Sequence, residues 1–517
     1  MNLRSFAFIR EIGQWKPNSL LLLINSLSKC QNLKQLRLDI DYHGFSHMKE
    51  HQYHLLRGYL LRFKFLENIS LGSLRGANHR FFSEVARIFG KLPNLKEFHP
   101  KVNFLNEKSQ RELEFMKALS GSKSLRDLNL NITGLPVKNI DIIASCIRSL
   151  ILLKTLRLAI SSDDVIQEEN NFWTSISGLN NLNELHLELR FFRTATVNFT
   201  NLRKLNALKN LKKMILVFEN KRNNQSFCDF WTAISSISEL STFWLSAKHF
   251  KIVLPDLETL NNNFQIWKNL KKLFLQWNDI EYTLDKQHYK IIGLGISLLS
   301  DKLEELRIRL PYSFPSDPNL ILPKRAFPNL IKFEYSGSIL ETNKEAYLAL
   351  GAFLGENLKI KKLRFAVNHI RRKKYQLPVP DDCRIQPQQL EMICDALIKL
   401  TDLQKLKLII GQCKNFKDLS SFNLISKMLS NMKALKIFIA NFGLDYLKEH
   451  ELRRMLTIFN SRVFRFIELK GEYNNLKAES KQLIQALNKK YKEIKNQDKK
   501  EESTLEKLEK YEISYNI

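Results

Sequence analysis

A short hydrophobic phrase recurs along the chain. It follows the pattern apolar-x-x-apolar-x-apolar, and it occurs as NLKQLRLDI from Asn32, NLNELHLEL from Asn181 and NLKKLFLQW from Asn269. The last residues of each copy alternate between apolar and polar, as Leu273 and Leu275 do. Alternation of this kind predicts a short strand with one buried face.

The segments after the predicted strands change to helical periodicity. The clearest case follows Leu135 and Pro136, where apolar residues return at spacings of three and four: Ile140, Ile143, Ala144, Ile147 and Leu150. This spacing predicts a helix with one buried stripe. A strand, a turn and a helix cannot bury their apolar faces alone. The units must therefore stack, with the strands in one parallel sheet and the helices outside it.

The period of the phrase is regular. If the first apolar residue of each copy is taken as the anchor of a unit, the anchors are Leu33, Leu66, Leu95, Leu125, Leu153, Leu182, Leu211, Leu240, Leu270, Leu303, Leu330, Ile360, Leu403, Leu435 and Phe464. Apart from one longer gap, between Ile360 and Leu403, their spacings are nearly constant. FWTSIS from Phe172 returns as FWTAIS from Phe230, two units later. A fixed period of this length predicts a solenoid.

These units resemble leucine-rich repeat proteins, specifically the long-repeat class that is similar to ribonuclease inhibitor and to the GTPase-activating protein of nuclear transport. The resemblance covers roughly Leu20 to Lys470. It implies an α/β horseshoe with a parallel sheet on the concave face and helices on the convex face. In this class an Asn or Cys eight positions after the anchor caps the turn. Asn278 and Asn368 fit, whereas Asp41 and Thr133 do not, so the turns are degenerate.

Three regions are expected along the chain. Residues 1–32 form an N-terminal cap with a helix from Asn18 to Lys29, residues 33–475 form a solenoid of about 15 units, and residues 476–517 form a charged helical tail. The tail is interpreted either as a solvated terminal helix or as a partner-seeking coiled coil. The segment from Met1 to Lys16 also allows an organelle transit peptide.

The charge and the cysteine content indicate which kinds of partner and which cellular compartment to expect. Lys and Arg number 81 against 53 Asp and Glu, giving a net charge of +28, which favours nucleic acid, an anionic membrane surface or an acidic protein. The six cysteines form no CxxC pair, as expected for reduced thiols inside the cell. A cytoplasmic location is favoured, and nuclear or organellar locations stay open. The apolar run Leu20–Ile24 is too short to span a bilayer, so no transmembrane segment is expected.

Motifs for catalysis are weak. The stretch His47 to His51 matches H-x-x-E-H, which places two imidazoles one helical turn apart, but no third ligand is identified near it. Gly293 and Gly295 lack the third glycine of a phosphate-binding loop. We therefore expect no catalytic residue, no metal site and no cofactor, and the chain is predicted not to be an enzyme.

Residues two, four and six after each anchor are expected to face the hollow of the solenoid, because strand side chains alternate between core and solvent. Around the middle of the chain they are apolar: Ile215, Val217, Trp244 and Phe274. Farther on they are basic: Lys272, Arg307, Arg309, Lys332, Lys362, Arg364, Lys405 and Lys407, against Glu305 and Glu334. The concave face is thus predicted to carry an exposed aromatic spot beside a positive stripe. The alternative is that a degenerate register turns Trp244 or Phe274 into the core.

The longest gap between anchors, from Ile360 to Leu403, contains a basic cluster. Arg371, Arg372, Lys373 and Lys374 precede Pro378 and Pro380, which indicates a protruding loop. The cluster is interpreted as a binding loop, a nuclear import signal or an inert insertion.

The sequence therefore predicts a non-enzymatic leucine-rich repeat scaffold that binds a protein partner with an acidic surface through its concave face, as a single chain or as a subunit of a larger assembly. The predicted contacts are Trp244, Lys272, Phe274, Arg307, Arg309, Lys362, Arg364, Lys405 and Lys407, together with Arg371, Arg372, Lys373 and Lys374. The alternative is binding of RNA or another polyanion through the same basic half. A merely solubilising surface is the third interpretation, and the sequence does not indicate an oligomeric state.

Overall fold

A computed structural model describes residues 3–10, 17–40, 48–73, 87–88, 91–103, 110–133, 140–162, 169–191, 199–223, 228–235, 237–250, 254–278, 286–309, 322, 325–337, 344–367, 387–410, 419–441 and 466–470. The chain forms two compact units, Met1–Tyr282 and Thr283–Ile517.

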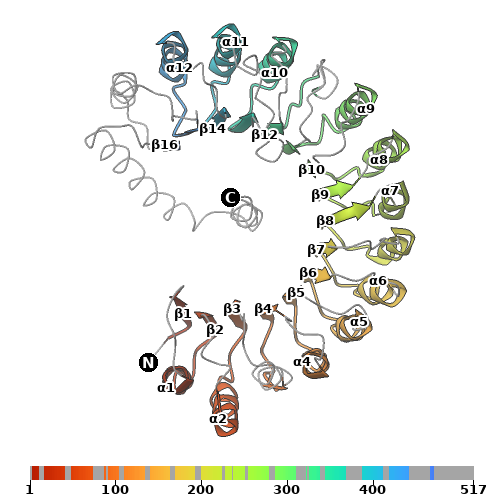
Figure 1. Ribbon diagram of the computed structural model, residues 1–517, viewed down its shortest axis with the longest axis vertical. Helices are drawn as coiled ribbons and strands as arrows, with labels where there is room; N and C mark the ends of the chain where they lie inside the picture. The colour runs from red at the N-terminus through yellow and green to blue at the C-terminus, as the bar shows by residue number, and fades with distance from the viewer. Residues whose placement is uncertain are drawn as a thin grey trace, which may run out of the picture. The chain divides into compact units, whose positions relative to one another are not determined.

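The first unit alternates strands and helices, with the strands on its inner side and the helices on its outer side (Figure 1). Its strands are β1 (Ser5–Arg10), β2 (Gln35–Ile40), β3 (Asn68–Ser73), β4 (Glu97–Asn103), β5 (Asp127–Thr133), β6 (Thr155–Ser162), β7 (Glu184–Phe191), β8 (Lys213–Asn223), β9 (Thr242–Phe250) and β10 (Lys272–Asn278). Its helices are α1 (Pro17–Ser28), α2 (Glu50–Leu60), α4 (Gln110–Leu119), α5 (Ile140–Ser149), α6 (Glu169–Ser177), the 3-10 helix η3 (Phe199–Ala207), α7 (Cys228–Ile234) and α8 (Leu254–Ile266). Each strand pairs in parallel with the next one along the chain.

The second unit repeats this arrangement. Its strands are β11 (Glu305–Arg309), β12 (Lys332–Gly337), β13 (Lys362–Val367), β14 (Lys405–Ile410), β15 (Ile437–Asn441) and β16 (Phe466–Lys470), again paired in parallel and in chain order. Its helices are α9 (Lys286–Ser297), α10 (Lys344–Glu356), α11 (Pro387–Ile398) and α12 (Leu419–Asn431). A parallel sheet built from repeated strand and helix units of this period is an α/β leucine-rich repeat solenoid, as the sequence predicts.

The core lies between the sheet and the helices. The anchors Leu33, Leu125, Leu211 and Leu303 are fully buried, because each points from the start of its strand toward the helices. The duplicated aromatic motif packs alike in both copies. Phe172 and Trp173 meet edge to face with ring centroids 5.0 Å apart, and Phe230 and Trp231 do so at 4.8 Å. The two-unit repeat in the sequence is therefore a repeat in the packing of the core.

Asparagines join neighbouring repeats at the turns that precede the strands. Asn181, one residue before its anchor, donates through Nδ2 to the carbonyl oxygen of Ile151 at 3.0 Å, and Asn210 donates to Asn180 at 2.8 Å. Asn94 makes the same bond to Lys64. In each case the acceptor lies two residues before the preceding anchor. The Asn of the recurring phrase therefore satisfies a backbone carbonyl of the neighbouring unit.

Strand β1 lies within the segment that the sequence assigns to a cap. Residues Ser5–Arg10 pair in parallel with Gln35–Ile40, so a strand of the sheet precedes helix α1, which covers most of the expected cap helix. Residues 476–517, expected to form the tail, lie outside the described residues. Within the described segments no helix has the length and apolar character needed to cross a membrane.

Candidate interaction surface

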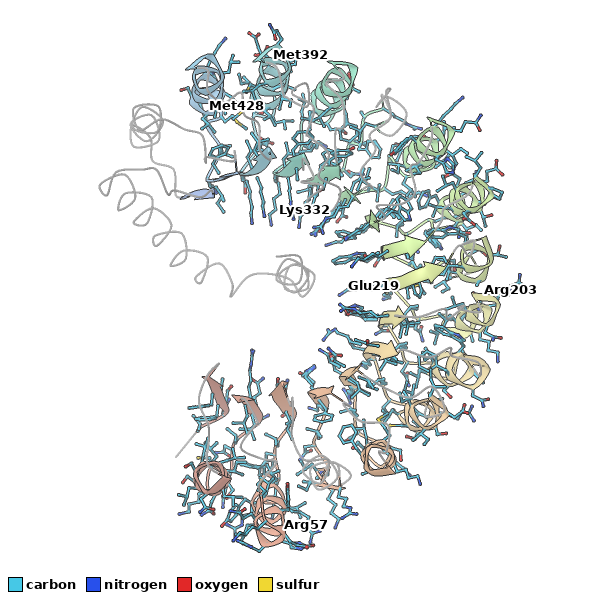
Figure 2. All side chains as sticks on the ribbon, in the orientation of Figure 1. Arg57, Arg203, Glu219, Lys332, Met392 and Met428 are labelled. Carbon is cyan, nitrogen blue, oxygen red and sulfur yellow. The ribbon has the colours of Figure 1, made fainter. Side chains whose placement is uncertain are left out.

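Each unit has a face of the sheet that none of the described helices covers, called here the helix-free face. It carries the residues two, four and six after each anchor, since their neighbours in sequence point into the core. Figure 2 shows Lys332 and Glu219 on this side of their strands, and Arg57 and Arg203 on the helix side. The predicted contact residues of the described strands stand on this face, at the positions that the alternation predicts.

The aromatic spot of the first unit is buried, and in this the prediction is wrong. Trp244 on β9 and Phe274 on β10 are in register, and their rings stack with centroids 5.3 Å apart. Only 5% of Trp244 and 2% of Phe274 are exposed. Ile215 on β8 is in register with Trp244 and is buried too. Strands about 4.8 Å apart bring such large side chains into contact along the row, so they cover one another.

Charges on the helix-free face of the first unit are largely paired. Lys213 lies 3.0 Å from Glu184 on the adjacent strand, and Lys248 lies 2.8 Å from Glu219. Arg190 contacts Glu188 on its own strand. Lys272, one of the predicted contacts, is half-buried on β10 beside Thr242. This face therefore carries no uninterrupted positive stripe.

His186 and Asp127 are among the titratable groups of the first unit whose pKa values are shifted. Desolvation lowers the pKa of His186 on β7 to about 3, and the positive charges of Arg157 and Lys213 act in the same direction. Burial raises the pKa of Asp127 on β5, although Arg157, 3.8 Å away, and His99 act against the rise. The imidazole of His186 is therefore neutral at physiological pH.

A buried carboxylate organises the helix-free face of the second unit. Glu334 on β12 is 2% exposed and lies among three arginines. Arg309 contacts its Oε1 at 2.8 Å, Arg364 contacts the same atom at 3.2 Å, and Arg307 lies 3.8 Å from Oε2. Burial alone would raise the pKa of Glu334, but the three guanidinium groups and the hydrogen bond from Arg309 lower it to about 2. Glu334 is therefore ionised and fixes the arginine side chains.

The sequence predicts Arg307 as a partner contact, but the structure makes it an internal group. Only 4% of it is exposed, since it lies between Glu305 at 3.7 Å and Glu334. A guanidinium buried in this way neutralises carboxylates within the sheet face and has little surface left for a partner. Arg309 and Arg364 are less buried and retain part of their surface.

Beyond Glu334 the second unit carries cations side by side. Lys332 on β12, Lys362 on β13 and Lys405 on β14 occupy one row of the register, and Arg364 and Lys407 are paired in the next row. Lys362 is exposed, and Lys405 and Lys407 are half-buried. We call these five residues the cation ladder.

Two acids lie beside the ladder: Lys332 is 3.8 Å from Glu305, its neighbour on β11, and Arg364 is 3.2 Å from Glu334. Lys332, Lys362 and Lys405 are direct neighbours in the register of three adjacent strands. A row of like charges on adjacent strands attracts anions.

The loop cluster Arg371, Arg372, Lys373 and Lys374 lies outside the described residues, so its role stays a prediction. His43 and His47 also lie outside them, while His51 and His54 are exposed on α2. Gly293 and Gly295 lie inside helix α9 and form no loop. Among the described residues no group of three or more His, Cys, Asp or Glu side chains is placed to hold a metal ion.

Sequence reasoning missed the central role of Glu334, because it treats this residue as one of two acids that interrupt a positive stripe. The signal is nevertheless present in the sequence. Glu334 and two of its arginines, Arg307 and Arg364, all stand four residues after their anchors, in adjacent units. Equal offsets on adjacent strands are in register, so the sequence already places an arginine on each side of the carboxylate.

Comparisons with known proteins add little to this description. No protein-family model matches the chain, and no curated protein matches it. Among solved structures, the chain is similar to one described as the crystal structure of the Rad7 and Elc1 complex in yeast, with a TM-score of 0.37 and 16% sequence identity, over 70% of this chain and 87% of that chain. A similarity this remote supports no inference about function, which must come from the surface itself.

Proposed function

We propose that the chain is a non-enzymatic leucine-rich repeat scaffold that binds an acidic segment of a partner protein on the helix-free face of its second unit. The cation ladder carries this proposal. Lys332, Lys362 and Lys405 form one row without an intervening acid, and Arg364 and Lys407 extend it. A row of adjacent cations is electrostatically complementary to an anionic segment of a partner.

The neighbouring groups support a protein ligand. Glu334 holds Arg309 and Arg364 in place, and a planar guanidinium with fixed orientation binds carboxylates in a bidentate manner. Carboxylates spaced along an extended chain would match cations that follow one another across neighbouring strands, as Lys332, Lys362 and Lys405 do. The repeat length and helices support assignment of the repeats to the long-repeat class resembling ribonuclease inhibitor.

Binding of RNA is the second candidate, since the same cations would also bind phosphates. The burial of Tyr335 and Phe365, which lie on β12 and β13 of the same unit, argues against it, because these rings are not available as platforms for base stacking. Without stacking, RNA binding would depend on charge alone and would fall steeply with salt.

The test measures two probes on the full chain. Fluorescence anisotropy compares a labelled ten-residue oligoglutamate with a ten-nucleotide single-stranded RNA, each at about 50 and 300 mM NaCl. The variant Lys362→Glu/Lys405→Glu reverses two charges of the ladder, and Arg203→Glu/Lys290→Glu reverses two exposed charges on the helix side as the matched control. We expect the ladder variant to lower oligoglutamate affinity by at least about tenfold and the control to change it little.

A capture experiment identifies the class of partner. The intact protein is used as bait in a nuclease-treated extract of its own cells, with both variants in parallel. A protein that is retained by the wild type and the control but lost with the ladder variant supports the proposal. RNA binding that exceeds oligoglutamate binding, or equal losses in both variants, would reject it.

A further inference from the structure

The turns that lead from the helices into the strands of the first unit carry a second basic surface. Because the strands are parallel and in chain order, the turns before them lie along one edge of the sheet. Backbone bonds link them directly, as from Lys154 N to the carbonyl oxygen of Arg126 at 2.7 Å. We call this line of turns the turn edge. It is separate from the cation ladder, which lies in the second unit.

The charge of the turn edge is predominantly positive. The five segments 121–126, 150–154, 180–183, 209–212 and 267–271 contain no Asp or Glu, whereas the turn 237–241 contributes Glu239 and the turn before β3 contributes Glu67, which pairs with Lys34 and Lys96. The basic residues of the five segments are all exposed: Lys123, Arg126, Lys154, Lys209, Lys212, Lys268 and Lys271. The motif KNLKK occurs at Lys209 and again at Lys268, so the two-unit duplication has copied these cations. The edge therefore attracts an extended anionic surface.

Exposed apolar side chains are interspersed among these cations. Ile151 is 60% exposed and Leu152 is 44% exposed, and both stand in the turn that also carries Lys154. Ile266 is exposed at the end of α8, just before Lys268, and Phe65 is exposed beside Lys64 in the turn before β3. Large apolar residues thus protrude at three places along a basic edge.

The combination of exposed cations and exposed apolar side chains indicates which anionic partner fits the turn edge: a nucleic acid, a protein or a membrane. Ile151, Leu152 and Ile266 have no π face, so Phe65 is the one residue of these four that could stack a nucleic-acid base. The core of a protein interface gathers apolar groups into one patch and is depleted in lysine, whereas here each apolar site is flanked by lysine. A peripheral membrane-binding surface has these two features. Its cations bind anionic lipid headgroups, and its apolar side chains insert at the boundary between the headgroups and the acyl chains.

We infer that the turn edge of the first unit docks on the surface of an anionic lipid bilayer, with Ile151 and Leu152 inserted between headgroups and the seven exposed cations above them. Docking of this kind orients the strands of the first unit steeply to the bilayer, because the turn edge lies at the ends of these strands. The inference does not depend on the proposed partner site.

Vesicle co-sedimentation of the full chain tests the inference. Vesicles of phosphatidylcholine alone are compared with vesicles that contain about 30% phosphatidylserine, at about 50 and 300 mM NaCl. We expect binding to the anionic vesicles at low salt, weaker binding at high salt and little binding to the neutral ones. Lys209→Glu/Lys212→Glu should lower the partition coefficient at least about 25-fold, at about fivefold for each cation lost.

An apolar variant and its control separate insertion from simple charge attraction. Ile151→Ser/Leu152→Ser should lower anionic-vesicle binding about tenfold. Leu22→Ser removes an apolar side chain that is 66% exposed on α1, away from the turn edge, and should change nothing. All these side chains are exposed, so the variants should fold, which far-UV circular dichroism would verify.

Three results would overturn the inference. They are absence of binding to anionic vesicles at low salt, equal effects of the Leu22→Ser control and the apolar variant, and RNA binding that the charge variant abolishes while the apolar variant leaves it intact. The last result would identify a nucleic acid as the ligand of the edge. The ladder variant Lys362→Glu/Lys405→Glu serves as a further control, since it should lose oligoglutamate and keep vesicle binding.

Discussion

Arg309 contacts Glu334 through two nitrogens, with Nη2 at 2.8 Å and Nε at 3.1 Å from the same carboxylate oxygen, across the adjacent strands β11 and β12. Arg364 approaches that oxygen from β13 at 3.2 Å. One carboxylate therefore holds guanidinium groups from both neighbouring strands. Its removal would leave three cations close together in a partly desolvated site.

Glu334→Gln should destabilise the protein strongly for this reason. Breaking a buried ion pair by removing one partner costs about 3–5 kcal/mol, because the remaining charge is left uncompensated. Urea denaturation at pH 7 measures the loss. Glu305→Gln is the matched control: Glu305 is less buried and lies 3.7 Å from Arg307, so its loss should cost about 1 kcal/mol or less. Similar losses in the two variants would contradict the central role of Glu334.

Lys362→Glu should raise the stability of the protein while it lowers the affinity for oligoglutamate. Lys362 stands in register between Lys332 and Lys405, so reversing its charge turns two repulsions into two attractions. Cross-strand pairs of opposite charge contribute about 0.2–1 kcal/mol, and we expect the midpoint of urea denaturation to rise accordingly. The same change should weaken oligoglutamate binding.

A neutral variant completes this test. Lys362→Gln removes the repulsion without adding attraction, and its stability should lie between those of the wild type and Lys362→Glu. A ladder that is only a solubilising surface would show the gain in stability with no loss of binding. A loss of stability in Lys362→Glu would mean that the row is not repulsive.

The fold could be predicted from sequence because every unit encodes it locally. Each repeat contains the anchor, the alternating apolar and polar residues of the strand, and the apolar residues at helical spacing. The exposure predicted for Trp244 is wrong, although Ile215, Trp244 and Phe274 all stand four residues after their anchors and are in register. The equal offsets place these side chains in one row, but they do not show that large side chains in a row bury one another. The sequence shows the recurring Asn before the anchor, but it does not show that a backbone carbonyl of the previous repeat accepts the hydrogen bond from this side chain.

Asn357 should be more costly to remove than the exposed Asn329. It is buried, donates through Nδ2 to the carbonyl oxygen of Phe353 at 2.6 Å and accepts a hydrogen bond from the backbone N–H of Phe327 at 2.6 Å. Asn357→Ala leaves the Phe327 N–H without this acceptor and should cost about 2–3 kcal/mol. Asn329→Ala, which removes an exposed bond to the Asp301 carbonyl, should cost about 1 kcal/mol in the same urea experiment. A smaller loss for Asn357 than for Asn329 would contradict this ranking.

His186 should make the first unit sensitive to mild acid. Its pKa in the folded chain is lowered to about 3, from a usual value of 6.5, by desolvation and by the charges of Arg157 and Lys213. The unfolded chain therefore binds a proton below pH 6.5 that the folded chain does not bind until about pH 3, so stability falls as the pH falls through this window. Between pH 6.5 and 5 this group should remove at most about 2 kcal/mol.

The variant His186→Gln keeps a polar side chain of similar size and removes the titration. Its free energy of unfolding, measured by urea denaturation at pH 7, 6 and 5, should fall less with acid than that of the wild type. The difference between the two slopes isolates His186 from the other histidines, which both proteins share. Parallel slopes would mean that His186 is protonated in the folded chain. The row of Arg157, His186 and Ile215 on strands β6 to β8 would then have to accommodate a second cation beside Arg157.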